Sequence, residues 1–125
     1  MGLRGMMRGC ALAIVLGALT PANADEGVAA FYKGRTIDLV VGYGTGGGYD
    51  TYARALAPFL AKHVPGSSQI VIRNMPGASS LTALRHVATA APRDGTVIGA
   101  FNPTLIAMSA LEPGKVKLDF ASLTW

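Results

Sequence analysis

Three segments of the chain each run from a short apolar strand pattern through a tight turn into a helix pattern. The strand patterns are Ile37 to Val41, Gln69 to Met75 and Thr96 to Phe101. Strands that alternate with helices at this spacing predict an α/β fold whose parallel sheet is built with right-handed crossovers. In such a sheet the turns that follow the strands meet at the carboxyl edge, where ligands bind.

The helix after the first strand has a clear apolar stripe. At helical spacing the stripe consists of Tyr49, Ala53, Leu56, Leu60 and Val64. We expect Pro58 to kink or shorten this helix, because proline removes one backbone hydrogen bond from a helix interior. In the second unit either Ser79 or Ser80 can cap the helix that follows. In the third unit an asparagine at 102 and a proline at 103 resemble a cap and a first helical position.

The first 24 residues have the pattern of a cleaved signal peptide. Two arginines precede an apolar run at residues 10–19, which is too short to span a bilayer. Ala22 and Ala24 fit the two small pockets of signal peptidase. Cys10 is the only cysteine, so the mature segment, residues 25–125, has no disulfide or thiol chemistry. Export to the periplasm is therefore predicted.

We predict cleavage after Ala24, which leaves Asp25 at the mature N-terminus. N-terminal sequencing of the protein recovered from the cell envelope tests this prediction. Recovery from the cytoplasm of an intact chain that begins at Met1 would contradict export.

Charge and histidine placement argue against two classes of protein. Without the signal segment the chain has nine basic and seven acidic residues, a balance of +2, and no cluster of Lys or Arg. This composition argues against a nucleic-acid-binding protein. Neither His63 nor His86 has a carboxylate at ligand spacing, so no metal site is predicted. We also predict no cofactor.

The turn after the first strand has five glycines in seven residues, 42–48. Three of them, Gly42, Gly44 and Gly47, match the G-x-G-x-x-G spacing of dinucleotide-binding loops. A dinucleotide site also needs an acidic residue about 20 positions later, and no Asp or Glu lies between Asp50 and Asp94. No Gly-Lys-Ser/Thr follows the glycines either, which excludes a P-loop. Nucleotide binding is therefore not predicted.

The turns after the three strands can together form an anion site. They span Gly42 to Asp50, Pro76 to Ser80 and Asn102 to Thr104. Each leads into a helix N-terminus, whose unpaired N–H groups and partial positive charge attract anions. We weigh the first turn towards ligand binding, because a connector does not need so many glycines, and the third towards a connector. The candidate ligand contacts in these turns are Tyr43, Thr45, Gly46, Gly47, Gly48, Asp50, Ala78, Ser79, Ser80, Asn102 and Thr104.

An enzyme is the less favoured alternative. Residues 77–81 begin like the nucleophile elbow of a serine hydrolase but lack its closing glycine. His86 lies on the same predicted helix, faces away from its N-terminus, and no pair of acidic residues is placed for acid–base catalysis. No catalytic residue is therefore predicted, and a small secreted enzyme that uses Ser79 or Ser80 stays an alternative hypothesis.

Three longer segments resemble one known family. The segments "FYKGRTIDLVVGYGTGGGYDTYARALAPFLAKHVPG", "IVIRNMPGASSL" and "APRDGTVIGAFNPT" occur in this order. They resemble the substrate-binding proteins of tripartite tricarboxylate transporters, the Bug (TctC-like) family, over essentially all of residues 25–125. The resemblance implies the N-terminal lobe of a type II periplasmic binding-protein fold and a small di- or tricarboxylate ligand. It also implies a monomer that delivers this ligand to a membrane permease without catalysis.

The resemblance also implies where the ligand lies. In this family the turns after the first and second strands hold a ligand carboxylate, largely through backbone N–H groups, and here these turns are 42–50 and 76–80. Family members commonly have glycine where this chain has Ser79, which either adds a hydroxyl donor or crowds the pocket. Asp50 has two interpretations: it complements the dipole of the first helix, or it contacts the ligand. As a contact it would repel a plain carboxylate and pair with an amine, so Asp50→Asn would tighten dicarboxylate binding or weaken amino-acid binding.

The chain is shorter than a two-lobed protein of this family. Family members are about two domains long or more, and residues 25–125 correspond to part of the first lobe. We therefore expect a fragment or a truncated gene, with an exposed sheet edge and marginal stability. A truncated remnant that binds nothing is the alternative to a binding protein.

Overall fold

The computed structural model describes residues 24–66 and 69–123. The expected signal peptide therefore lies outside the described residues, except for Ala24, which begins the first helix. The elements in chain order are α1 (Ala24–Tyr32), β1 (Thr36–Val41), α2 (Gly48–His63), β2 (Gln69–Asn74), η1 (Ala78–Ser80), α3 (Leu81–Thr89), β3 (Val97–Ala100), α4 (Thr104–Leu111), α5 (Pro113–Val116) and η2 (Phe120–Ser122).

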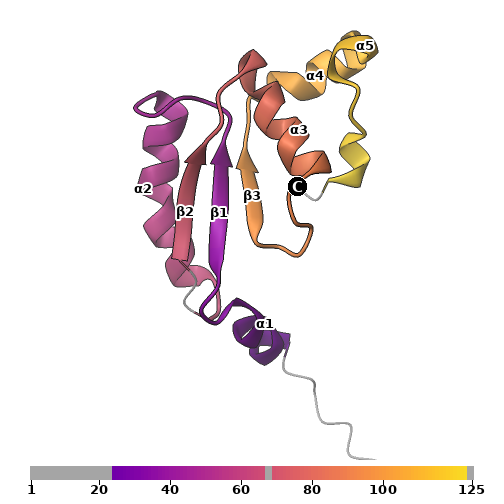
Figure 1. Cartoon of the computed structure of the whole chain (residues 1–125). Helices are drawn as coiled ribbons and strands as arrows, with labels where there is room; N and C mark the ends of the chain where they lie inside the picture. Colours follow the sequence, from indigo (N-terminus) through magenta and orange to yellow (C-terminus); the bar gives the residue numbers. More distant parts are fainter. Residues whose placement is uncertain (1–23, 67–68, 124–125) are drawn as a thin grey trace, which may run out of the picture.

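The three strands form one parallel sheet in the order β2-β1-β3 (Figure 1). In the register of the sheet, Leu39 of β1 lies between Ile72 of β2 and Ile98 of β3. The expected α/β class with a parallel sheet is confirmed, and each strand begins and ends within one residue of its predicted bounds.

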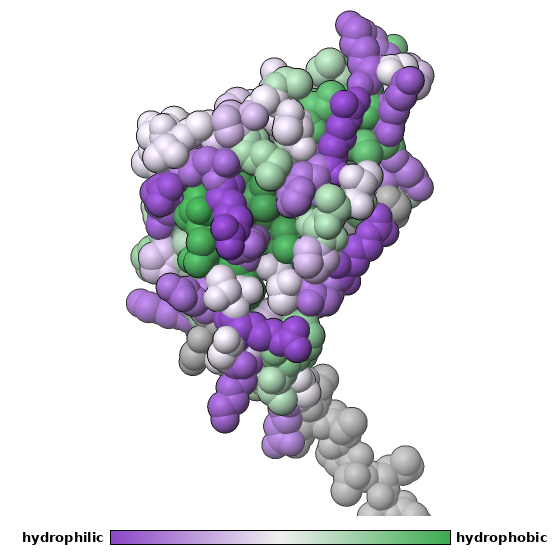
Figure 2. All heavy atoms as spheres, viewed as in Figure 1, coloured by the Kyte–Doolittle hydropathy of each residue, from purple (hydrophilic) through white to green (hydrophobic). Residues whose placement is uncertain are grey.

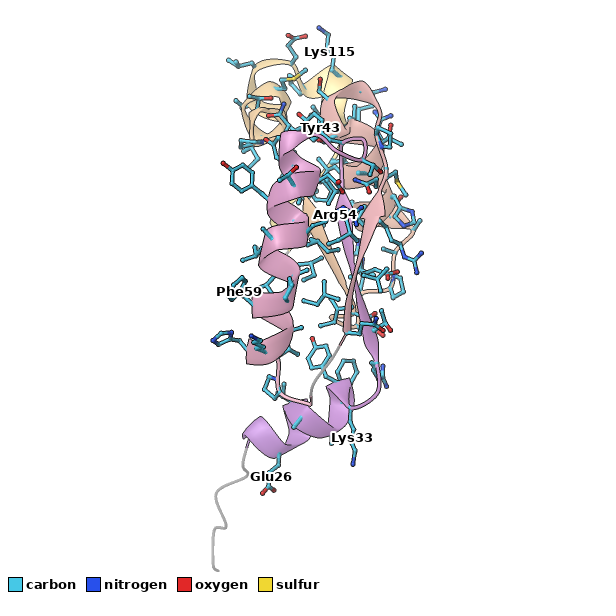
Figure 3. All side chains as sticks on the ribbon, turned by 90° about the vertical axis from the view of Figure 1, so that its left-hand side faces the viewer. Glu26, Lys33, Tyr43, Arg54, Phe59 and Lys115 are labelled. Atoms are coloured by element: carbon cyan, nitrogen blue, oxygen red, sulfur yellow. The ribbon has the colours of Figure 1, made fainter. Side chains whose placement is uncertain are left out.

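The central strand β1 is buried because a helix lies on each face of the sheet. Leu39 and Val41 pack with Ala53 of α2 in one apolar cluster. The next residue along, Val40, points to the opposite face, where it is 2% exposed. Helix α3 contacts β1 and β3, and it lies on the other side of the sheet from α2 (Figure 3).

The apolar stripe of α2 differs from the sequence prediction at two positions, Tyr49 and Leu56, of which Tyr49 is 38% exposed. Ala53 and Ala57 are buried, whereas Leu56 is 52% exposed. Two alanines on the buried face let the helix axis approach the sheet closely, and Leu56 lies about 100° around the helix from Ala57. The prediction that Leu56 faces the core is therefore wrong.

Pro58 does not shorten α2, which continues to His63. A proline inside a helix loses its hydrogen bond to the carbonyl four residues earlier, here that of Arg54. Burial of Ala53 and Ala57 against the sheet holds the turn on which this bond is missing, because packing supplies most helical stability. The helix ends at His63, and the N–H of the C-cap residue Val64 donates to the Leu60 carbonyl.

The described part of the fold leaves apolar surface open. Tyr52, Leu56 and Phe59 form an exposed apolar line along α2, and Ile98 of β3 is 41% exposed. Figure 2 also shows apolar surface at the centre of the visible face, between α2 and α3 (Figure 2). Within the described residues, no helix combines the length and apolar character needed to cross a membrane.

Candidate functional site

The turns that follow the three strands lie side by side at the carboxyl edge of the sheet (Figure 1). Hydrogen bonds hold them there: the Met75 N–H donates to the Val41 carbonyl at 2.8 Å, and the Gly42 N–H donates to the Ala100 carbonyl at 3.0 Å. The sequence-predicted residues of all three turns are therefore brought to one edge, as the parallel topology requires.

Ser80 joins the first and third turns from its place in the second. Its side chain is fully buried, and its hydroxyl donates to the Gly42 carbonyl at 3.3 Å. The same oxygen accepts the Asn102 N–H at 3.2 Å. Ser80 occupies the N-cap position of α3, but its side chain makes no cap hydrogen bond. The prediction that a serine side chain caps this helix is therefore wrong for Ser80, because its hydroxyl serves the neighbouring turns.

The second turn has an unusual backbone. Ala78, Ser79 and Ser80 are consecutive non-glycine residues with positive φ values of 44°, 52° and 77°. The left-handed region costs such residues about 1–2 kcal/mol each. Ser79 is exposed at the tip of this turn, so its hydroxyl is available to solvent or to a ligand, whereas the Ser80 hydroxyl is not. Burial of Ser80 also argues against its use as a nucleophile.

Asp50 lies at the centre of a hydrogen-bond network behind the glycine turn. It is 2% exposed. One carboxylate oxygen accepts the Arg54 Nε–H at 2.9 Å and the Gly46 N–H at 2.8 Å, and the other accepts the Asn74 side-chain amide at 2.9 Å. The hydrogen bonds from Arg54, Gly46 and Asn74 hold the pKa of Asp50 far below its usual range.

Asn74, the last residue of β2, connects this network to the rest of the glycine turn. Its amide nitrogen also donates to the Tyr43 carbonyl at 3.0 Å, and its oxygen accepts the Thr45 hydroxyl and the Arg54 guanidinium, both at 3.2 Å. Sequence reasoning missed both Asn74 and Arg54 as site residues. The spacing of Asp50 and Arg54, four residues apart in a helix, was a signal for their pairing.

The first turn of α2 presents free backbone donors. The Gly46 N–H is used by Asp50, and the Gly47 N–H makes a long bond of 3.4 Å to the Gly44 carbonyl. The first N–H that bonds within the helix is that of Thr51, at 2.9 Å from the Gly47 carbonyl. Within the described residues, the Gly48 and Tyr49 N–H groups therefore have no acceptor, as expected of a helix N-terminus.

The surface beside these donors is partly aromatic. The rings of Tyr43 and Tyr49 stack with their centroids 4.3 Å apart, and the residues between them, 44–48, are exposed. Tyr43 lies at the head of α2 in Figure 3, at the same end as the free N–H groups (Figure 3). An anion at this helix end would therefore meet backbone donors and an aromatic wall.

Within the third turn the side chains of Asn102 and Thr104 bond to one another. The Asn102 side-chain oxygen accepts the Thr104 N–H at 3.0 Å and the Thr104 hydroxyl at 2.8 Å. The predicted roles are shifted by one residue: α4 begins at Thr104 and its N-cap position is Pro103, so Asn102 bonds the first helical N–H from one residue before the cap. Since Asn102 and Thr104 satisfy one another, they fit the connector role better than that of ligand contacts.

An apolar cavity of about 380 Å³ adjoins the third turn and is lined mainly by side chains of β3, α3, α4 and η2, including Leu84, Phe101, Leu105 and Phe120. In the part of the chain that the structure describes, no group of three or more His, Cys, Asp or Glu residues is placed to hold a metal ion.

Comparison with known proteins gives one curated relative. A protein of Bordetella bronchiseptica named as a UPF0065 protein is 32% identical over 104 residues, which cover 83% of this chain. The match extends over only 30% of the length of that relative. No family model matches the chain. UPF0065 is the Bug family, so the homology supports at a coarse level the family expected from the sequence motifs.

Proposed function

We propose that this chain is the ligand-binding N-terminal part of an exported solute-binding protein that captures a small di- or tricarboxylate for a tripartite membrane transporter. The homology to a UPF0065 protein supports the Bug family. We infer a carboxylate ligand from the open N-terminus of α2, because the three residues between Thr45 and Tyr49 are all glycine and no side chain covers the helix end there. A periplasmic location follows from this proposal together with the signal sequence pattern.

In the proposed site one ligand carboxylate lies against the Gly48 and Tyr49 N–H groups. Two backbone donors and the positive end of a 16-residue helix favour an anion there. Ser79, on the exposed tip of the neighbouring turn, supplies a hydroxyl donor from the second side. A helix terminus contributes about 0.3–1 kcal/mol per favourable contact, so this half of the site gives modest affinity by itself.

No catalytic step belongs to this proposal. Ser80 is buried with its hydroxyl engaged by two backbone groups, and His86, on α3, has no hydrogen bond to either serine among the described residues. Labelling of Ser79 by a fluorophosphonate would favour the secreted-enzyme alternative over a binding protein.

Replacing Gly48 by valine should weaken carboxylate binding by about tenfold or more, because the new side chain covers the donors at the helix end. The fold should tolerate the change, since a Cβ at Gly48 meets no atom within 4 Å. Calorimetric titration of the purified protein with succinate and with citrate measures the effect. Gly27→Val is the matched control: a Cβ there also meets no atom within 4 Å, and α1 lies at the opposite end of the sheet (Figure 1).

The outcomes of this titration separate the two parts of the proposal. Unchanged affinity in Gly48→Val, with normal binding by the unsubstituted protein, would move the site away from the glycine turn. Absence of binding by the unsubstituted protein to all di- and tricarboxylates tested would contradict the function itself and favour a remnant that binds nothing.

A further inference from the structure

We propose that Asp50 is a positioning residue: its buried carboxylate fixes the glycine turn so that the Gly48 and Tyr49 N–H groups stay open to a ligand carboxylate. This inference rests on the proposed function and assigns a role to a side chain that does not itself touch the ligand. It also disfavours ligands with an amine, because the carboxylate nearest the site, that of Asp50, is already bonded to other groups of the protein.

The Asp50 carboxylate binds one backbone N–H group of the glycine turn and leaves the next donors of the helix end open. Asp50 is in the first turn of α2, and its side chain reaches back to the Gly46 N–H at 2.8 Å. Gly46 has φ +83°, a conformation that glycine adopts without strain. The bond therefore holds a specific bend just before the helix, and the Gly48 and Tyr49 N–H groups have no acceptor among the described residues.

Asn74 attaches the glycine turn to the sheet. Asn74 at the end of β2 bonds both to Asp50 and to the Tyr43 carbonyl, and accepts the Thr45 hydroxyl. Residues 43, 45 and 46 of the turn are thus held to a strand end through one asparagine and one aspartate. A glycine-rich turn loses much conformational entropy when it is ordered, so a mobile turn would bind the ligand less well.

The negative charge of Asp50 is neutralised by its pairing with Arg54. An exposed carboxylate this close to the helix N-terminus would repel an anionic ligand. Asp50 avoids this because it is buried and paired with Arg54, whose Nε–H lies 2.9 Å from the carboxylate and whose terminal nitrogen bonds to Asn74. The pair has no net charge, and two hydrogen bonds, to Asp50 and to Asn74, fix the position of the guanidinium.

The hydrogen bonds to Asp50 also limit which class of ligand fits this turn. Both Asp50 oxygens are occupied by Gly46, Arg54 and Asn74, so this turn offers no carboxylate to a ligand ammonium group. The geometry therefore favours a carboxylate that has no amine beside it, such as succinate, over an α-amino acid such as aspartate.

The experiment compares Asp50→Asn with the unsubstituted protein. Asparagine has one acceptor oxygen and an amide that must face at least one of the three donors, so at least one hydrogen bond is lost. We expect the Gly46 amide proton to exchange with solvent about tenfold faster, by NMR, and succinate affinity to fall about tenfold. A direct contact between Asp50 and the ligand predicts the opposite sign, because removal of the negative charge would tighten succinate binding.

Asp38→Asn is the matched control, since it removes the same charge from another ion pair. The Asp38 carboxylate pairs with Arg73 at 2.6 Å, and both side chains are partly exposed on the strands, away from the glycine turn. We expect this variant to leave the Gly46 exchange rate and the succinate affinity unchanged. Equal changes in both variants would indicate a general effect of net charge and would overturn the assignment.

A second, compensating variant keeps the test valid if Asp50→Asn is poorly folded. Asp50→Asn combined with Asn74→Asp exchanges the two side chains and restores one carboxylate to the network, at the cost of a repulsive contact with the Tyr43 carbonyl. Partial recovery of Gly46 protection and of succinate affinity is expected. Normal Gly46 protection in Asp50→Asn would overturn the positioning role, whereas absence of succinate binding in every protein would overturn the proposed function.

Discussion

Replacing Gly42 by alanine should remove much of the folding stability of this protein. A Cβ built at Gly42 lies 2.4 Å from both the Cβ and the Oγ of Ser80, and 2.9 Å from its Cα. The last of these is a backbone atom in the left-handed turn, so no side-chain rotation relieves the overlap. Overpacking of this kind costs about 3 kcal/mol, a large fraction of the roughly 5–15 kcal/mol that holds a domain folded.

Urea denaturation followed by circular dichroism measures this loss of stability. Gly48→Ala is the matched control, because it makes the same chemical change in the same turn at a position with no atom within 4 Å of the new Cβ. We expect the control to change the free energy of unfolding by less than about 0.5 kcal/mol. Equal unfolding midpoints for the two variants would show that the first and second turns are not in contact as described.

Replacing Ser80 by alanine should destabilise the protein by about 1–3 kcal/mol, the cost of leaving buried polar groups without partners. The Gly42 carbonyl and the Asn102 N–H both lose the hydroxyl that joins them. Because the three turns are linked through this oxygen, the loss should also increase amide exchange in the first and third turns. Thermal denaturation and hydrogen exchange by NMR measure the two effects.

The neighbouring serine supplies the control for this prediction. Ser79 is exposed and has a similar positive φ, 52°, so Ser79→Ala changes the same atoms without breaking a hydrogen bond that the structure records. We expect no measurable change in stability. Ser80→Gly should be less destabilised than Ser80→Ala, since glycine relieves the left-handed conformation at this position. A loss of stability in Ser79→Ala as large as that in Ser80→Ala would contradict the role given to the Ser80 hydroxyl.

The apolar surface that remains open bears on the expectation of marginal stability. Tyr52, Leu56 and Phe59 of α2 and Ile98 of β3 are exposed, whereas the core of the described residues is small and rich in alanine and valine. The prediction of marginal stability is still to be tested, but this arrangement explains why Leu56 could not be assigned from periodicity. A helical stripe defines a face of the helix, but not which edge of that face the sheet will cover.

Local patterns were sufficient for the elements and for the meeting of the three turns at one edge of the sheet. Strand-turn-helix units fixed the parallel sheet, and the rule that parallel strands end at one edge placed the three turns together before any contact was known. The start of the last predicted helix near Asn102 was also predictable to within one residue, because the bond between Asn102 and Thr104 joins residues two apart in the chain. In each of these cases the interaction that matters lies within one turn or one element.

The contacts that shape the site were decided only by the tertiary structure. Asp50 meets Asn74 across 24 positions of sequence, and Ser80 meets Gly42 across 38. Both contacts depend on strand register and on the path of the crossovers, which no local pattern encodes. For this reason the sequence did not predict the contact between Gly42 and Ser80, and it left Asp50 with two interpretations. The glycine at 42 is needed because another turn approaches it, a fact that exists only once the chain has folded.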